Sequence, residues 1–447
     1  MTGNEILALA MLFSMITVIF IGFPISFTLL FIALVFGAIG LGLELTFNLA
    51  YLQIWGFMKD DILPAVPLFI FMGFMSEKAG LMTRLFESLR NILAPIPGSL
   101  YLAVLLTATV FAMATGIVGA AVTVLGIMAG PMMVKYGYEE RLSAGAIAAG
   151  GTLGILIPPS VMLVVMGPLM GVPVNQLYAA AIVPGFLLAG LYIIYCLVRS
   201  LLNPKLGPPV PRDERVTDVR KLAFEFIAGV VPLLVLIGAT LGTILTGLAT
   251  ATEAASCGAL GSTLLALAYR KLTLQGLKEV AIATLATSSM VLFLAVASSV
   301  FGAVFAKLGG GGLITGAVAS IPLPDMGKLI VIMAIIFVLG WPFEWAAIVL
   351  IFLPIFLPTV EALNIGLSKQ ELLLWFGVTV AVNMQTAFLS PPVAMSAYYL
   401  KNVMPGWSLG MIYKGMMQFM VIQVICLALL FIWPEIALWL PRSLKDQ

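Results

Sequence analysis

The chain of 447 residues contains no histidine, and only 9% of its residues are charged. The missing imidazole removes the commonest ligand of transition metals and the usual general base of enzymes, which excludes histidine-dependent chemistry. Soluble globular domains contain about 25% charged residues. With 62% hydrophobic residues and a mean hydropathy of +1.15, this chain is instead predicted to be a polytopic membrane protein.

Other features are scarce or missing as well. The few cysteines are far apart in apolar surroundings, which predicts small core residues rather than a disulfide or a metal site: Cys196, Cys257 and Cys426. Neither a GxxxxGK[ST] nor a GxSxG motif occurs, which argues against ATP hydrolysis and against a nucleophile elbow, so any transport by this chain would draw on an ion gradient. No basic region precedes the apolar runs of residues 7–42, which predicts a first pair of spans rather than a cleaved signal peptide.

The run GGTLGILIPPS, residues 150–160, lies in a segment without a charged residue between Arg141 and Arg199. Such a segment predicts a membrane-spanning helix, but its paired prolines remove backbone donors and its glycines weaken the helix. In hydrocarbon, an interrupted helix leaves amides and carbonyls without partners, which is costly unless they line a cavity or hold a ligand. The interruption is therefore a candidate binding site.

The same series of landmarks occurs twice at a nearly constant offset, which indicates an internal repeat. Each series has a broken apolar pair, a span that ends near a glycine, a long apolar stretch that ends at a proline, and paired prolines. The corresponding positions are residues 22–26 and 247–251, residues 77–81 and 306–310, Pro131 and Pro358, and residues 158–159 and 391–392.

We therefore predict an all-α polytopic membrane protein with an inverted-topology repeat, an architecture that recurs in secondary transporters. The predicted units are a first repeat (1–203), a cytoplasmic linker (204–222) and a second repeat (223–447). Each repeat is expected to contain a re-entrant hairpin, over about 98–134 and 328–360, and a broken helix, over about 139–170 and 370–401.

The inversion is inferred from the positive charges. Lysine and arginine lie on both sides of the first hairpin, and they are also frequent in the linker, as expected for cytoplasmic segments. The N-terminus is then predicted to be periplasmic, and the second hairpin enters from the external side. Segments 47–59, 82–94 and 272–280 are amphipathic and predict arms along the interface, although plain connecting helices are equally consistent with them.

Polar groups gather at the predicted hairpin tips and helix breaks. Near the tip and the break of the first half, the hydroxyl-bearing residues are Thr115, Thr123, Thr152 and Ser160, beside the backbone of Gly150 and Gly151. The second half has Asn383, Gln385, Thr386 and Ser390, with the backbone of Gly340. A single hydroxyl most simply bonds to its own helix, but the clustering at both breaks favours a functional interpretation.

Glu344 is the only carboxylate between Lys328 and Glu361, at the tip of the second predicted hairpin. Because intramembrane carboxylates are costly, it is a candidate sodium ligand, proton carrier or helix cap; the alternative is a tip exposed to external water. Glu253 is better explained as part of a capping box with Thr250. The tryptophans at 341 and 345 either shape a substrate cavity or belong to an interfacial belt.

Four stretches carry a resemblance to a known family: ATGIVGAAVTVLGIMAGPMMVKYGY, RLSAGAIAAGGTLGILIPPS, GLATATEAASCGAL and NMQTAFLSPPVAMSAYYLKNV. Over essentially its full length, the chain resembles the large membrane (M, DctM-like) subunit of tripartite ATP-independent periplasmic (TRAP) transporters. The resemblance implies an elevator-type importer of the bacterial inner membrane that is not an enzyme. Sodium ions would be its coupling ions and it would have no other cofactor. Its partners would be a small four-helix membrane subunit, a periplasmic solute-binding protein and a small, carboxylate-bearing solute.

The resemblance also implies site residues. The sodium regions would contain Thr115, Gly116, Gly151 and Thr152 in the first half, and Gly340, Glu344, Gln385 and Thr386 in the second. The substrate would be bordered by Pro158, Pro159, Ser160, Asn383, Ser390, Pro391 and Pro392. Many members have a serine-rich SGSS-like tip where this chain has residues 115–118, TGIV, so backbone carbonyls are the expected ligands there. No small subunit is appended, so that partner must be separate.

Two other classes of function are weighed against this hypothesis. A stand-alone sodium-coupled carrier of the dicarboxylate type would share the fold but work without a binding protein. An intramembrane enzyme or scaffold would need a catalytic dyad near the midplane of the membrane. The absence of histidine and of paired intramembrane acids argues against the enzyme.

Overall fold

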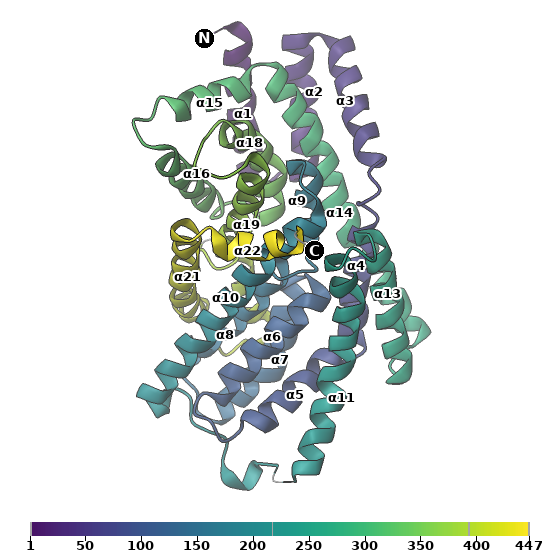
Figure 1. Cartoon of the computed structure of the whole chain (residues 1–447), viewed down its shortest axis with the longest axis vertical. Helices are drawn as coiled ribbons and strands as arrows, with labels where there is room; N and C mark the ends of the chain where they lie inside the picture. The colour runs from purple at the N-terminus through teal and green to yellow at the C-terminus, as the bar shows by residue number, and fades with distance from the viewer. Residues whose placement is uncertain (1, 217, 392–393, 446–447) are drawn as a thin grey trace.

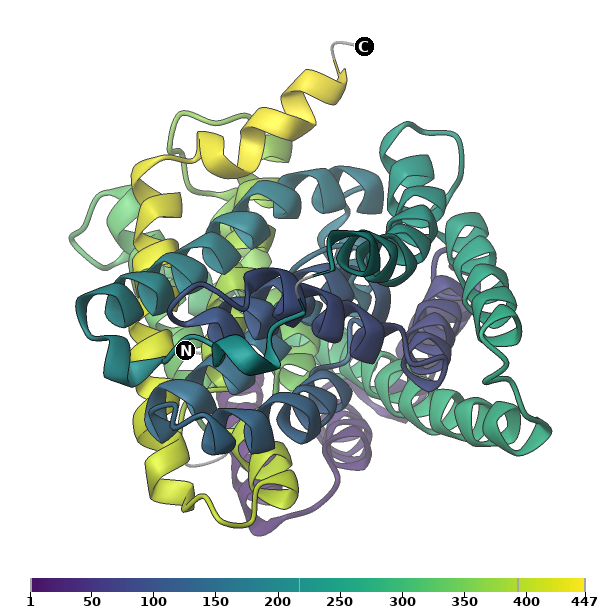
Figure 2. The same ribbon diagram turned by 90° about the horizontal axis from the view of Figure 1, so that it is seen from below.

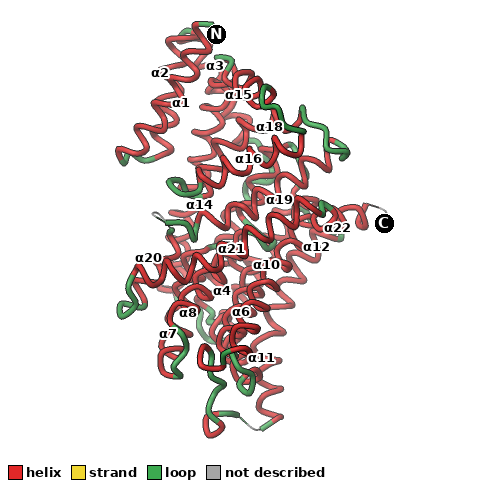
Figure 3. Tube along the Cα trace, turned by 90° about the vertical axis from the view of Figure 1, so that its left-hand side faces the viewer, coloured by secondary structure: helices red, strands yellow, loops and turns green. Residues whose placement is uncertain are grey.

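The computed structural model describes residues 2–216, 218–391 and 394–445, and within these ranges it contains helices and connecting segments but no strand (Figure 3). The molecule is elongated, with its N-terminus at one end and α5 and α11 near the other (Figure 1). By length and composition, the described part has six helices able to cross a membrane, or seven if one bent pair forms a single span: Gly3–Ile21, Val118–Lys135, Val174–Leu202, Val219–Leu245, Leu274–Lys307 and Leu409–Ile432. The predicted all-α, multi-pass class is thereby confirmed.

Glycine and proline set many helix boundaries in the first half. Gly22 closes the first helix with a φ of 104°, a conformation open to glycine, and Pro24 directly precedes the next helix. The helices are α1 (Gly3–Ile21), α2 (Ile25–Leu41), α3 (Leu43–Met58), α4 (Ala65–Lys78), α5 (Leu81–Leu93), α6 (Ser99–Thr115), α7 (Val118–Lys135), α8 (Glu140–Thr152), α9 (Val161–Met170) and α10 (Val174–Leu202).

The second half has a similar order of elements, with π-helical turns at Gly238–Gly242 and Ile348–Phe352. Its helices are α11 (Val219–Ile237), α12 (Thr243–Leu245), α13 (Ala251–Ala268), α14 (Leu274–Lys307), α15 (Gly310–Ala319), α16 (Asp325–Leu339), α17 (Trp345–Ala347), α18 (Leu353–Glu361), α19 (Lys369–Ala387), α20 (Met395–Val403), α21 (Leu409–Ile432) and α22 (Glu435–Lys445).

Two boundaries differ from the sequence-based prediction. The predicted separate arm at 272–280 is the beginning of α14, because no proline interrupts the chain from there to Lys307. The last residues of the predicted linker are already helical, since Asp218 caps α11 by accepting hydrogen bonds from the amides of Arg220 and Lys221. The rest of the linker is irregular, apart from short 3₁₀ turns at Pro204–Leu206 and Arg212–Glu214.

The helices pack in pairs that join the two halves of the chain. Helix α4 packs against α13, and α2 packs against α14. Toward the other side of the molecule, α8 packs against α21, and α10 packs against α19. Figures 1 and 2 show α13 and α21 on opposite sides of the molecule. These contacts are related in pairs. When α2 is replaced by α13 and α4 by α14, the contact between α4 and α13 becomes the contact between α14 and α2. When α8 is replaced by α19 and α10 by α21, the contact between α8 and α21 becomes the contact between α19 and α10.

The centre of the molecule is formed by α8 and α19, which are buried from Leu142 to Thr152 and from Leu372 to Ala387. Helix α8 meets α21 backbone to backbone, because a Cβ atom on Gly415 would lie 2.1 Å from the Arg141 carbonyl oxygen. Such close approach by small residues is typical of helices that associate within membranes, where lipid is as apolar as the core.

The outer helices expose apolar side chains, as expected for surfaces that face lipid. Phe13, Phe31 and Val235 are examples on α1, α2 and α11. Cys257 is exposed on α13, so its prediction as a core residue was wrong, whereas Cys196 and Cys426 are buried as expected. Helix α13 turns this face outward beside its exposed leucines, so a small apolar residue fits there equally well.

Candidate functional site

The first helix break separates α8 from α9. After Thr152, a 3₁₀ turn at Leu153–Ile155 leads into an irregular segment that contains the cis peptide bond between Pro158 and Pro159. The Ser160 hydroxyl begins α9 by accepting a hydrogen bond from the Leu163 amide, and it donates one to a carbonyl in the 3₁₀ turn, that of Ile155. The Thr152 hydroxyl donates to the Ala149 carbonyl at 2.8 Å. Both predicted hydroxyls thus bond to nearby backbone.

The glycines ahead of this break allow close packing against the first hairpin. A Cβ atom on Gly151 would lie 2.3 Å from Cγ2 of Val122 on α7, and one on Gly150 would lie 3.1 Å from Cβ of Ala108 on α6. The sequence predicted that these glycines weaken the helix, but it gave no signal for this packing role. They hold the break directly against both helices of the hairpin.

The second helix break separates α19 from α20. The Thr386 hydroxyl donates to the Asn383 carbonyl at 2.7 Å, and the Ser390 hydroxyl donates to the Thr386 carbonyl at 2.7 Å. The Asn383 amide nitrogen Nδ2 donates to the Met333 carbonyl of α16 at 2.9 Å. Pro391 follows in a turn, and the predicted Pro392 lies outside the described residues.

Two side chains at this second break have unsatisfied polar atoms. Gln385 is 0% exposed, and neither Oε1 nor Nε2 has a hydrogen-bond partner in the described structure. Oδ1 of the buried Asn383 also has none. Leaving a buried polar atom unpaired costs about 1–3 kcal/mol, so such atoms call for an explanation, and a bound ion or ligand is one.

Each hairpin tip lies against the break of its own half. Helices α6 and α7 meet at Gly116, whose φ of 59° suits glycine and whose Cβ position is 3.6 Å from the Gly154 carbonyl oxygen. In the second half, a Cβ atom on Gly340 would lie 3.1 Å from Cβ of Ala387, the last residue of α19. The side chain of Thr115 falls outside what the structure describes, although the residue ends α6.

A cavity of about 470 Å³ brings the two tips together. From the predicted set, Gly116, Thr123, Glu344 and Trp345 line it. Other predicted residues do not line it and are buried: Gly151, Thr152, Pro158, Pro159, Ser160, Asn383, Gln385, Thr386 and Ser390. Gly340 is buried outside this lining, and Trp341 is exposed. The cavity therefore lies between the hairpin tips, and the broken helices also reach it, through Ile155 and Val161 at the first break and Phe388 and Met395 at the second.

Two carboxyl groups line the cavity. Glu77 at the end of α4 lines it together with Glu344, and none of its described lining residues is a lysine or arginine. The neighbouring Lys78 forms an ion pair with Glu279, at 2.5 Å. The sequence analysis missed Glu77 as a cavity residue and used it only to mark the internal repeat. The position of a carboxylate one residue before the end of an apolar helix could have identified it. Its position opposite the hairpin tips depends on tertiary packing.

Aromatic side chains complete the cavity wall. Phe74, Trp345, Phe388 and Tyr399 all line it.

The predicted capping box is confirmed at the other candidate carboxylate, because the Thr250 hydroxyl accepts from the Glu253 amide at 3.2 Å and Glu253 accepts from the Thr250 amide at 2.8 Å. Glu253 therefore belongs to a helix terminus rather than to the cavity.

Known proteins of similar sequence match nearly the whole chain. The family model described as "Tripartite ATP-independent periplasmic transporter, DctM component" matches residues 12–436. The sialic acid TRAP transporter large permease protein SiaM of Vibrio cholerae is 28% identical, covering 96% of this chain and 97% of that protein. The C4-dicarboxylate TRAP transporter large permease protein DctM of Pseudomonas aeruginosa is 30% identical, covering 85% and 86%.

Solved structures of similar fold are also membrane transporters. The Alcanivorax borkumensis YdaH transporter has a TM-score of 0.65 at 16% identity, and the match covers 90% of each chain. MtrF of Neisseria gonorrhoeae has a TM-score of 0.55 at 14% identity, covering 89% of this chain and 84% of that one. At these identities the likeness concerns the fold alone. The family match, which spans nearly the whole chain, shows that this protein belongs to the large permease subunits of TRAP transporters.

Proposed function

We propose that this chain is the transmembrane subunit of a sodium-coupled importer of a small, carboxylate-bearing solute. A periplasmic solute-binding protein would deliver the solute, and a small four-helix membrane subunit would complete the complex. Relatives are named for sialic acid, C4-dicarboxylates and isethionate, all of which are organic acids. The protein would lie in the bacterial inner membrane with its N-terminus in the periplasm.

The observation that carries the sodium coupling is the pair of unsatisfied side chains at the second break. Within the described part of the chain, Oε1 of Gln385 and Oδ1 of Asn383 are buried oxygens without hydrogen-bond partners. Hard cations are bound by such carbonyl-type oxygens. We assign Gly340, Glu344, Gln385 and Thr386 to the second sodium region. We assign Asn383, whose Oδ1 is also unpaired in the described structure, to the border of the solute.

The first sodium region would depend mainly on backbone carbonyls. We assign it to the end of α6 and the end of α8, with Thr115, Gly116, Gly151 and Thr152. The Thr152 hydroxyl proton is used within its own helix, but its oxygen keeps a lone pair for a cation. The close approach of Gly150 to Ala108 of α6 and of Gly116 to Gly154 supports this assignment, because it brings the first hairpin and the end of α8 together.

The charge of the cavity supports coupling to a cation. Glu77 and Glu344 line it without a basic residue, so an anionic solute alone would be repelled. Bound sodium ions would offset that repulsion, and the free amides at the start of α9 would favour the solute carboxylate. The solute would be bordered by Pro158, Pro159, Ser160, Asn383, Ser390 and Pro391; Pro392 is assigned from the resemblance alone.

We also propose that the chain is an inverted repeat that moves as an elevator. The units would be 1–203, a linker at 204–222 and 223–447. The exchangeable contacts of α4 with α13 and of α2 with α14 support a two-fold relation between the halves. Helices α1–α4 and α11–α14 would then form the fixed scaffold, and the hairpins with the broken helices would move across the membrane.

The test is uptake by liposomes that contain this chain and its two partners, with and without an inward sodium gradient. The solutes are sialic acid, a C4-dicarboxylate and isethionate. Gln385→Leu is expected to lower the apparent sodium affinity about tenfold or more, because it removes a buried oxygen ligand. Gln423→Leu is the control, since Gln423 is an equally buried glutamine on α21, whose side chain interacts with that of Tyr192. Equal sodium titrations for both variants would remove Gln385 from the site.

The same liposomes separate the tripartite importer from a stand-alone carrier. Uptake that needs all three components supports the proposal. Uptake by this chain without a binding protein would overturn the tripartite arrangement and favour the stand-alone carrier. Uptake that requires all three components but is independent of sodium would overturn only the coupling ion.

A further inference from the structure

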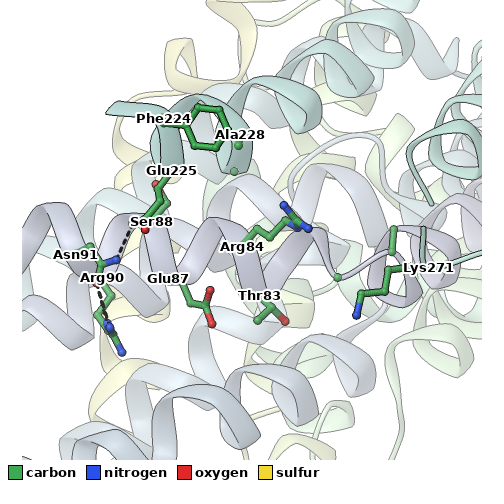
Figure 4. A pocket seen from close by; sticks show the side chains of 13 residues that line it. Thr83, Arg84, Glu87, Ser88, Arg90, Asn91, Phe224, Glu225, Ala228 and Lys271 are labelled. Carbon is green, nitrogen blue, oxygen red and sulfur yellow. Dashed lines mark hydrogen bonds between the residues drawn. The ribbon is translucent and has the colours of Figure 1, made fainter. Parts of the chain in front are cut away.

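A second cavity of about 450 Å³ lies between α5 and the first turns of α11, and Lys271 after α13 closes one side of it. It shares no lining residue with the cavity between the hairpin tips. Its size is within the range of small-molecule sites. Figure 4 shows that charged side chains from α5 surround it, which distinguishes it from the apolar grooves of the outer surface.

The cavity lies where exposed side chains change from apolar to charged. On α11, exposed Arg220 and Lys221 are followed by Phe224, which is 72% exposed and lines the cavity. On α13, exposed leucines such as Leu267 give way to Lys271 at the cavity. This change on neighbouring helices marks the level of lipid headgroups.

A hydrogen bond fixes the two helix ends beside the cavity. The Tyr269 hydroxyl, just after α13, donates to the Ala228 carbonyl of α11 at 3.0 Å. The Arg84 guanidinium of α5 lies over the ring of the same tyrosine, 4.2 Å from its centroid. Three helices therefore hold the cavity in shape.

Figure 4 shows Lys271 toward one end of this cavity and Glu225 toward the other, with Arg84 and Glu87 between them. Arg90 also lines the cavity at the Glu225 end, but its guanidinium donates to Oδ1 of Asn91 and to Sδ of Met132. In the described structure, the side chains of Arg84, Glu87 and Lys271 have no ion-pair partner. Glu225 accepts a hydrogen bond from Nδ2 of Asn91 at 2.9 Å, which holds it in place.

We propose that this cavity binds the phosphoethanolamine headgroup of a membrane lipid. The phosphate would lie beside Arg84 and Lys271, and the primary ammonium beside Glu87 and Glu225. The acyl chains would run along the exposed apolar side chains of α11. A headgroup with negative charge alone would meet two carboxylates, so the pattern of charges selects a zwitterion. A trimethylammonium group lacks N–H donors, so the carboxylates favour the primary amine over choline.

The test is native mass spectrometry of the purified full chain after exchange into detergent that contains phosphatidylethanolamine, phosphatidylglycerol or phosphatidylcholine. Phosphatidylethanolamine is expected to be retained most. Arg84→Gln and Lys271→Gln should each lower its retention about fivefold, and together about thirtyfold. Glu87→Gln should abolish the preference over phosphatidylglycerol. Lys205→Gln, at an exposed linker lysine outside the cavity, is the control and should change nothing.

Folding and the source of the phosphate are controlled separately. Arg84→Lys keeps the charge and should keep most of the retention, which separates loss of charge from loss of structure. Equal retention of phosphatidylethanolamine and phosphatidylglycerol would overturn the proposal. Unchanged retention in the Arg84→Gln, Lys271→Gln double variant would do so as well. Displacement of the lipid by millimolar inorganic phosphate would show a free-anion site instead.

Discussion

The contact between the first helix break and the first hairpin can be tested at one glycine. Gly151→Ala would place a Cβ atom 2.3 Å from Cγ2 of Val122 and 3.0 Å from the Val122 amide nitrogen. Valine has one favoured rotamer in a helix, and its backbone is held in α7, so neither atom can move away easily. The break and the hairpin must therefore separate by a few tenths of an ångström.

The expected loss of stability follows from two opposing effects. Overpacking a dense interior costs about 1–3 kcal/mol. Alanine is favoured over glycine within a helix by about 1 kcal/mol, which offsets part of that cost. The net change for Gly151→Ala is therefore a destabilisation of up to about 2 kcal/mol. Gly190→Ala is the matched control in α10, where an added Cβ atom would meet nothing within 4 Å. It should be neutral or slightly stabilising.

Thermal unfolding in detergent can be followed with a thiol-reactive dye. Cys196 and Cys426 are buried and react only on unfolding, while the exposed Cys257 is replaced by serine in all samples to lower the background. The apparent Tm of Gly151→Ala should fall by up to about 2 °C relative to the parent. The packing argument would be refuted if Gly151→Ala and Gly190→Ala unfolded at the same temperature.

Two further predictions concern a helix cap and the linker. Ser160→Ala removes the N-cap of α9, so the dye assay should register a loss of about 1 kcal/mol, and Ser160→Thr should restore most of it. The Tyr136 hydroxyl and the Lys135 ammonium hold the pKa of Glu214 below its usual value of 4.5. Because the folded pKa is lowered, this contribution is complete above pH 4.5 and is lost as the pH falls below it. Hydrogen exchange of the linker, corrected for its intrinsic pH dependence, should therefore accelerate below pH 4.5. In Glu214→Gln this exchange should already be fast at pH 7. Equal exchange in Glu214→Gln and in the unchanged protein at pH 7 would contradict this prediction.

The helix boundaries were the most predictable part of the fold. Gly22 and Pro24 separate α1 from α2, and Thr250 with Glu253 begins α13 with the expected capping box. These signals are local, because they depend on φ angles, missing amides and side-chain caps within a few residues. The predicted arm at 272–280 was wrong for a related reason: amphipathic composition does not end a helix, and α14 continues until Lys307.

The composition of the site was less predictable, because it depends on contacts between distant segments. Glu77 enters the cavity from α4, opposite a hairpin tip that is more than 250 residues away along the chain. Gly151 was singled out for its conformational freedom, yet its missing side chain matters for packing against Val122. A single sequence contains no record of which helix faces will meet, so these roles required the structure.

The two helix breaks differ in the hydrogen bonding of their side chains. At the first, the Thr152 and Ser160 hydroxyls donate to nearby carbonyls, so their protons are already satisfied. At the second, the buried Gln385 amide has no partner within the described residues, and neither has Oδ1 of Asn383, although the Thr386 hydroxyl is satisfied as in the first half. Substitution of a satisfied hydroxyl leaves the surrounding carbonyls in place, whereas substitution of Gln385 removes a side-chain oxygen that is free to bind an ion. If both breaks hold sodium, Gln385→Leu must therefore weaken sodium binding more than Thr152→Val, and the reverse order would contradict this division between backbone and side-chain ligands.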